Sequence, residues 1–124
     1  MKFLTNIILS WRIPSKKNSK TWTWKVLISS KDYREWEEAK LIELKEKIEP
    51  YHLNMGLRIE YRFYLPDRRR TDLSNKVESI NDLFVKYGLL EDDNWEIIKE
   101  LKVSWMGVDR ENPRCEIDIY SLYE

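Results

Sequence analysis

The sequence predicts a mixed α+β domain in which two helices pack on one sheet, with the element order β-β-α-β-α-β-β. Two observations lead to this prediction. Residues 56–65 alternate apolar and polar side chains, as a half-buried strand does, whereas residues 72–87 place apolar side chains at helical spacing. With 124 residues, 42% of them hydrophobic, the chain has the size of a single domain over residues 1–124 and needs no disulfide or zinc to hold its core.

The N-terminal part predicts two strands. Residues 3–12 are rich in β-branched and aromatic side chains, which favour strands. A polar loop at 14–20 separates this segment from residues 21–28, where Thr and Trp alternate. The alternation places Trp22 and Trp24 on one side of the second strand, which indicates packing in the core or in a dimer rather than stacking on bases.

A helix and a third strand are expected next. Ser30 is placed to cap a helix over residues 31–48, which Pro50 ends. The apolar residues of this helix roughly keep helical spacing, and its other residues are charged. Residues 56–65 follow as the strand with the most regular alternation in the chain.

The second helix, residues 72–87, carries a clean core-facing stripe. Its members are Leu73, Val77, Ile80, Phe84 and Tyr87, at spacings i, i+4, i+7, i+11 and i+14. Asp72 stands where the helix begins, and Gly88 is the expected C′ residue. Two final strands, 100–105 and 114–122, are expected on either side of a turn at 109–113.

Composition narrows the class of protein. Lys and Arg together number 22, as do Asp and Glu, so the net charge is zero, which argues mildly against a nucleic-acid-binding domain. The single cysteine, Cys115, has no partner in the chain, so we expect a reducing, cytoplasmic location. The N-terminal segment MKFLTNIILSWR is too short and too polar for a signal peptide or a membrane span.

The stretch over residues 67–93 is the most informative for function. Arginines at 68–70 suit phosphate, and the acidic turn at 91–93 can approach the helix if the chain turns back after Gly88. Within the helix, Glu78 lies one turn after Ser74, and its side chain leans back toward Asp72. Converging carboxylates suit a hard cation such as Mg²⁺, so the pattern indicates metal-dependent chemistry on a phosphodiester.

Each of these features also has a plainer interpretation. Asp72 at a helix start is commonly only a cap, and Glu78 on an exposed face is commonly only solvated. The acidic turn and the arginine run are then ordinary polar loops. The loop at 14–20, with its short and dense donors, suits backbone phosphates but is equally a simple connection.

Several of these segments together resemble a known family. The run PDRRRTDLSN at 66–75, followed by Asp82, Gly88 and the pair Asp92-Asp93, resembles the RusA family of Holliday junction resolvases. The segment PSKKNS at 14–19 resembles the early Pro-Ser-x-x-Asn loop of that family. The resemblance implies an α+β homodimer, often encoded by prophages, that binds four-way DNA junctions. It also implies paired nicks that depend on Mg²⁺, with Mn²⁺ as a substitute.

The resemblance also implies roles for individual residues. Asp72 and Asp93 correspond to acids of the family site, with Asp92 next to Asp93, and Asn75 corresponds to the family's Asn. The residues expected to contact DNA are Lys16, Lys17, Asn18, Lys20, Arg68, Arg69, Arg70, Asn75 and Lys76. For Lys76, an ion pair with Asp72 four residues earlier is the simpler interpretation.

Two positions depart from the family pattern. Ser74 stands where the family has its second Asp, and Glu78 stands where it has a Lys. Because these positions lie one turn apart on one face, our hypothesis is that Glu78 replaces the missing carboxylate. The metal ligands would then be Asp72, Glu78 and Asp93, with Asp92 supporting them or serving as an alternative ligand. The alternatives are a junction-binding relative without catalysis and a structural or regulatory dimer with no role on DNA.

Overall fold

We analysed the fold in a computed structural model, which describes the backbone of residues 1–15, 20–23, 26–29 and 31–123 and the side chains of 1–15 and 31–123. The elements in chain order are β1 (Lys2–Ser10), β2 (Lys20–Thr23), β3 (Val26–Ser29), α1 (Lys31–Lys47), β4 (Leu57–Leu65), α2 (Leu73–Tyr87), β5 (Ile98–Val108) and β6 (Arg114–Ser121). The predicted α+β class is confirmed.

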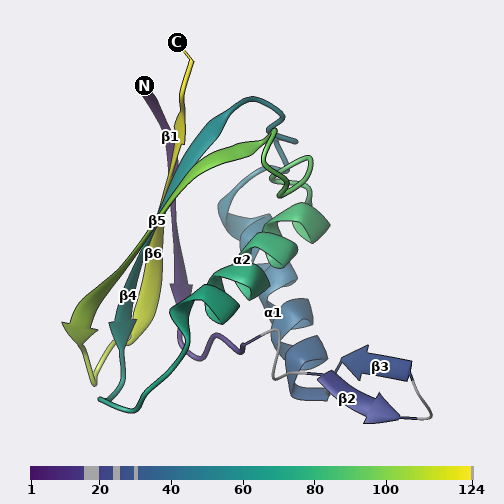
Figure 1. Ribbon diagram of the computed structural model, residues 1–124, viewed down its shortest axis with the longest axis vertical. Coiled ribbons are helices and arrows are strands. Elements are labelled where there is room, and N and C mark those ends of the chain that lie inside the picture. Colours follow the sequence, from purple (N-terminus) through teal and green to yellow (C-terminus); the bar gives the residue numbers. More distant parts are fainter. Residues whose placement is uncertain (16–19, 24–25, 30, 124) are drawn as a thin grey trace.

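The main sheet has four strands in the order β1-β6-β4-β5. β6 runs antiparallel to both of its neighbours, and β5 runs parallel to β4. Both helices lie on the same face of this sheet and leave the other face open (Figure 1). Because β4 and β5 are parallel, the long connection between them carries α2 across the covered face.

The strand predicted over residues 21–28 is two short strands. β2 and β3 pair antiparallel, with Lys20 opposite Ser29 and Thr23 opposite Val26, and form a separate two-stranded sheet. Alternation with a period of two is the same in one strand and in the two arms of a hairpin, so it did not reveal where the chain reverses. The side chain of Trp22 and the whole of Trp24 lie outside the described residues, as does Ser30.

The core lies between the covered face of the sheet and the helices. Its fully buried side chains include Ile59, Tyr61, Phe63, Ile80, Leu83, Phe84, Cys115, Ile117 and Ile119. Of the stripe predicted on α2, the three central residues are buried, while Leu73 and Tyr87 at its two ends are half-buried. The periodic pattern therefore identified the correct face of the helix.

Gly88 ends α2 as predicted. Its φ of 91° is left-handed, and its N–H donates to the carbonyls of Phe84 and Val85 at 3.1 Å. A Cβ added here would lie 2.9 Å from Cε1 of His52. We therefore expect Gly88→Ala to lower the free energy of unfolding by about 1–2 kcal/mol, measured by urea denaturation. Gly88→Asn should lose less, because Asn tolerates this conformation; equal losses would contradict the account.

The open face of the sheet carries a network of ion pairs. Arg62 lies 2.8 Å from Asp118 and 3.7 Å from Glu116, and Asn6 donates to Asp118 at 2.7 Å. Burial alone would raise the pKa of Asp118, but the hydrogen bonds from Arg62 and Asn6 outweigh it, so its pKa lies below the ordinary value. Asp118 is therefore more acidic in the folded state than in the unfolded chain.

This shift predicts a pH dependence of stability. A carboxyl group with a lowered pKa in the folded state stabilises the fold above its unfolded pKa of about 4, and this contribution is lost as the pH falls through the lowered value. Asp118→Asn should cost about 1–2 kcal/mol at pH 7. The difference from wild type should shrink below about pH 4 in urea unfolding. A difference independent of pH would contradict the assignment.

Candidate functional site

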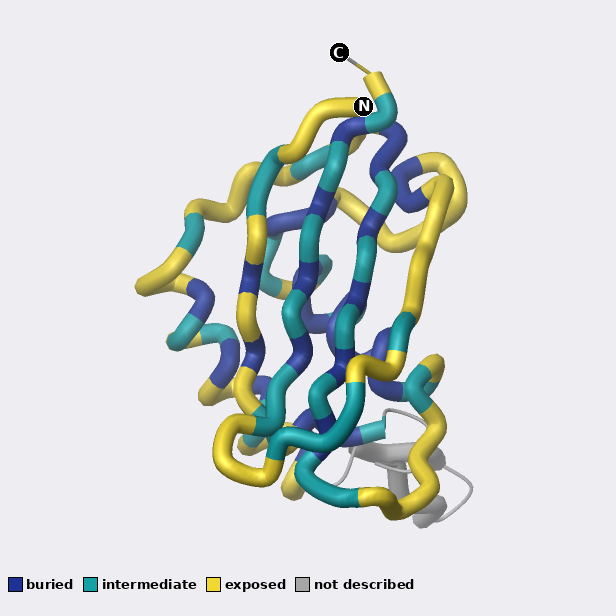
Figure 2. The backbone as a smooth tube through the Cα atoms, turned by 90° about the vertical axis from the view of Figure 1, so that its left-hand side faces the viewer, coloured by how far each residue is buried: buried dark blue, intermediate teal, exposed yellow. Residues whose placement is uncertain are grey.

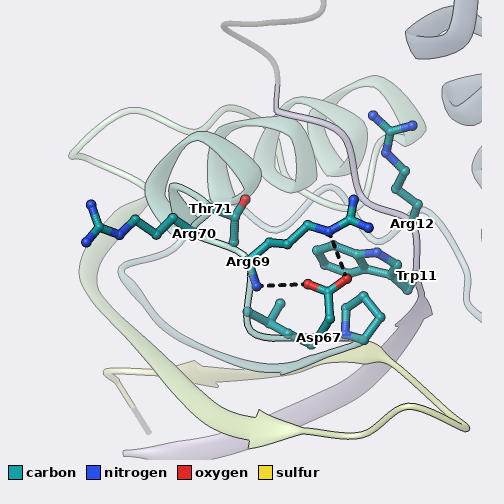
Figure 3. Close-up of a pocket in the computed structure, with 8 residues that line it drawn as sticks. Trp11, Arg12, Asp67, Arg69, Arg70 and Thr71 are labelled. Carbon is teal, nitrogen blue, oxygen red and sulfur yellow. Dashed lines mark hydrogen bonds and ion pairs between the residues drawn. The ribbon is translucent and has the colours of Figure 1, made fainter.

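The arginines at 68–70 lie in the loop that leads from β4 into α2. One side of this loop borders a cavity of about 440 Å³ (Figure 3), lined by Trp11, Arg12, Leu65, Pro66, Asp67, Arg69, Arg70 and Thr71. Oδ1 of Asp67 accepts a hydrogen bond from the backbone N–H of Arg69 at 2.9 Å, and its Oδ2 lies 3.5 Å from Nε of Arg69. Asp67 thus holds the shape of the loop.

An indole flanks the arginine loop on each side. Trp11 borders the first cavity, and Trp105 of β5 borders a second cavity, which Arg68, Arg69 and Arg70 also line. All three arginines are exposed. Guanidinium groups bind phosphate oxygens in a fixed fork, and indole rings offer surfaces on which bases stack. The loop therefore combines the two kinds of group that a nucleic-acid interface uses.

Asp72 is the N-cap of α2, as predicted. Its side chain accepts hydrogen bonds from the backbone N–H groups of Ser74 and Asn75, at 3.0 and 3.4 Å. The hydroxyl of Ser74 also donates to Oδ1 of Asp72, at 2.6 Å. Ser74 therefore supports Asp72 in its capping conformation. It does so from the position where the family pattern has its second acid. Asn75, half-buried in the first turn, contributes to the same cap.

The acidic turn is held by its own side chains. Oδ1 of Asp92 accepts from the N–H of Asp93, and Oδ2 accepts from Nδ2 of Asn94, both at 2.8 Å. Asn94 in turn accepts from the N–H of Glu96 at 2.9 Å. Asp92 therefore organises the turn, and both oxygens of its carboxylate take part.

The charge of Asp93 acts on Tyr61, a buried residue of β4. The phenol of Tyr61 donates a hydrogen bond to Asn81, and its pKa is raised by burial and, to a lesser degree, by the charge of Asp93. Asn81 is seven residues after Ser74 and three after Glu78, so these positions share one side of the helix. Tyr61 therefore links β4 to this side of α2 through Asn81.

The predicted metal ligands are not assembled. Glu78 is exposed, and among the described residues no group of three or more His, Cys, Asp or Glu side chains lies close enough to hold a metal ion. Asp72, Glu78 and Asp93 as placed in a single chain therefore do not fit a cation held by three acids. Asp72 is engaged as a cap at the start of α2, and Asp93 is in the turn that follows the helix.

Lys76 is buried rather than exposed to a DNA ligand. Its Nζ donates to the carbonyl of Ile13 at 2.8 Å and lies 4.8 Å from the ring centre of Trp11. Burial lowers its pKa, with Arg12 acting in the same direction and Asp72 opposing it. Lys76 thereby fixes the segment that carries Trp11 and Arg12 along the arginine cavity. Of the other residues expected to contact DNA, Lys16, Lys17 and Asn18 lie outside the described residues, and for Lys20 only the backbone is described.

Sequence reasoning missed four residues of this region. Trp11 and Arg12 line the arginine cavity from the end of β1, and Trp105 reaches it from β5. Trp95 is 72% exposed in the turn that carries Asp93, and Nζ of Lys99 lies 5.3 Å from its ring centre. The proximity of Arg12 to the basic loop at 14–20 was the signal available for Arg12. For Trp95, the signal available was its position two residues after Asp93.

Comparison with known proteins gives one partial similarity. Over 59 residues the chain is 29% identical to the crossover junction endodeoxyribonuclease RusA of Aquifex aeolicus, strain VF5. The aligned part is 48% of this chain and 47% of that protein, so the chain spans about half the length of the curated relative it matches. No protein-family model matches the chain. None of the described helices is long and apolar enough to cross a membrane.

Proposed function

We propose that this protein is an endonuclease that cuts branched DNA at four-way junctions. The observation that carries the proposal is the arginine loop, flanked by Trp11 and Trp105, which leads directly into the helix that Asp72 caps. The similarity to a crossover junction endodeoxyribonuclease supports the same class of substrate.

The side chains of the loop have separate tasks in this proposal. The exposed arginines bind phosphates of the DNA backbone, which fixes its position but reads no sequence. The indoles contact bases that the branch leaves unstacked. Asp72 then lies beside the bound backbone, at the end of the loop, where it can act on the phosphate that is cut.

The proposal includes two features implied by the resemblance. Symmetric nicks in two strands require two active sites, so we propose a homodimer with twofold symmetry. We also propose a requirement for Mg²⁺, which Mn²⁺ can replace. Mg²⁺ commonly uses one or two protein carboxylates together with substrate phosphates and water, so a site with fewer than three acids from one chain is compatible with this requirement.

A second candidate function is a junction-binding protein without catalysis. The observation that favours it is the hydrogen bond from Ser74 to Asp72, which uses an acid of the family site as part of a helix cap. Such a protein would retain the arginine loop and bind branched DNA, with an affinity that falls steeply as salt rises.

Cleavage of a labelled synthetic four-way junction distinguishes these functions. The protein is incubated with the junction or a linear duplex, in Mg²⁺, in Mn²⁺ or in EDTA. We expect nicks in the junction alone, and only with the metal. Tight binding without nicks in either metal identifies the second candidate. If the protein neither binds nor cuts the junction, both candidate functions are excluded and a structural or regulatory role remains.

A further inference from the structure

β5 lies at an edge of the main sheet. β4 pairs with one side of it, and no described strand pairs with the other. Most of its 11 residues are exposed, which makes it the exposed edge strand on the right of Figure 2. The backbone N–H and C=O groups along such an edge can pair with another strand, and proteins usually shorten or cover edges of this length.

An apolar row continues from the core onto β5. Leu101, Val103 and Trp105 pair in register with Ile59, Tyr61 and Phe63 of β4, respectively. The three β4 residues are fully buried, whereas their β5 neighbours are 53%, 40% and 55% exposed. The apolar surface therefore extends past the area that the helices cover. An exposed apolar row on a free sheet edge is typical of an interaction surface.

We infer that β5 pairs antiparallel with β5 of a second copy, about a twofold axis at Leu101. A twofold interface must be complementary to itself. In this register Glu100 of each copy faces Lys102 of the other, and opposite charges across a strand pair stabilise it. The register centred on Lys102 sets two lysines opposite each other. The register centred on Val103 sets Glu100 opposite Met106 and Lys102 opposite Ser104, so neither charge faces an opposite charge.

The two ends of β5 carry opposite charges nearby, which also favours a second copy as the partner. The acidic turn precedes the strand, and the arginine loop lies near Trp105 toward its other end. In the proposed register Trp105 faces Ile97 of the second copy, immediately after the turn that carries Asp92 and Asp93. Trp105 lines a cavity of the arginine loop. Each arginine loop therefore lies beside the acidic turn of the other copy. The pairing itself does not rest on the proposed nuclease function.

Charge exchange tests the pairing. Sedimentation over a range of concentrations should show a dimer for the wild-type chain. Glu100→Lys replaces two attractive pairs with two repulsive ones, so we expect the dimer dissociation constant to rise about tenfold or more. The double variant Glu100→Lys/Lys102→Glu should restore the wild-type value. Glu100 also forms an ion pair with Arg58 in the same chain, at 3.3 Å. Both variants lose this pair, so a recovery in the double variant must come from the contact between copies.

Cross-linking tests the register. Leu101→Cys should be joined across the twofold axis by a short bismaleimide, while Ile8→Cys, at the exposed edge formed by β1, should not. The native Cys115 is buried, and burial raises its pKa, so it does not compete. A monomer at every concentration, cross-linking at Ile8→Cys alone, or no rescue by the double variant overturns the inference. A monomer that cuts junctions overturns only the interface, and a dimer that binds no DNA overturns only the proposed function.

Discussion

Asp72→Asn is expected to abolish junction cleavage without destabilising the fold. Asn caps helices as well as Asp does, so the N–H groups of Ser74 and Asn75 keep an acceptor. Only the negative charge is lost. The proposal makes Asp72 an acid that acts at the reacting phosphate, and loss of such a group lowers rates by roughly 10²–10⁴-fold. Single-turnover cleavage and urea denaturation of the same preparation measure the two properties.

Two further variants separate catalysis from capping. Asp72→Ala should lose cleavage and also about 1 kcal/mol of stability, because it removes the cap. Glu78→Ala should be as damaging to cleavage as Asp72→Asn if Glu78 supplies the carboxylate missing at position 74. Glu78 is exposed and outside the core, so its loss should leave stability unchanged. Full cleavage by Asp72→Asn would show that Asp72 is only a cap.

Replacement of Arg68, Arg69 and Arg70 by Ala is expected to weaken junction binding and flatten its dependence on salt. Each phosphate contact contributes about 0.9 to the slope of log affinity against log salt, so loss of three contacts lowers the slope by about 3. Titrations of a labelled junction at several salt concentrations measure this slope. These exposed arginines lie outside the core, so the variant should stay folded.

A matched control removes the same charge elsewhere. Lys2, Lys31 and Lys45 are exposed and lie away from the arginine loop in β1 and α1. Their replacement by Ala should leave the salt slope within experimental error of wild type. Equal effects of the two triple variants would mean that net charge, and not the loop, drives binding.

The sequence correctly predicted those parts of the structure that are determined by residues close together in the chain. The alternation of β4, the apolar stripe of α2, the cap at Asp72 and the left-handed Gly88 each depend on residues within a few turns of one another. These patterns correctly identified the fold class and the helix that carries the candidate site.

The rest depended on contacts between distant segments. Lys76 is buried because the carbonyl of Ile13, 63 residues away, accepts its hydrogen bond, and no local pattern shows that contact. The same packing brings Trp11 and Arg12 to the arginine cavity. The positions of the acids relative to one another likewise depend on where the chain runs after Gly88. The spacing of Asp72, Glu78 and Asp93 in the sequence did not determine whether they meet.

The most direct test of the account is to map the cuts that the wild-type protein makes in a four-way junction labelled in turn on each of its four strands. With Mg²⁺ present, we predict nicks at symmetric positions in two opposing strands, with none in the linear duplex of the same sequence. Binding to the junction without any nick, or equal nicking of junction and duplex, would contradict the proposal that this protein is a junction-selective endonuclease.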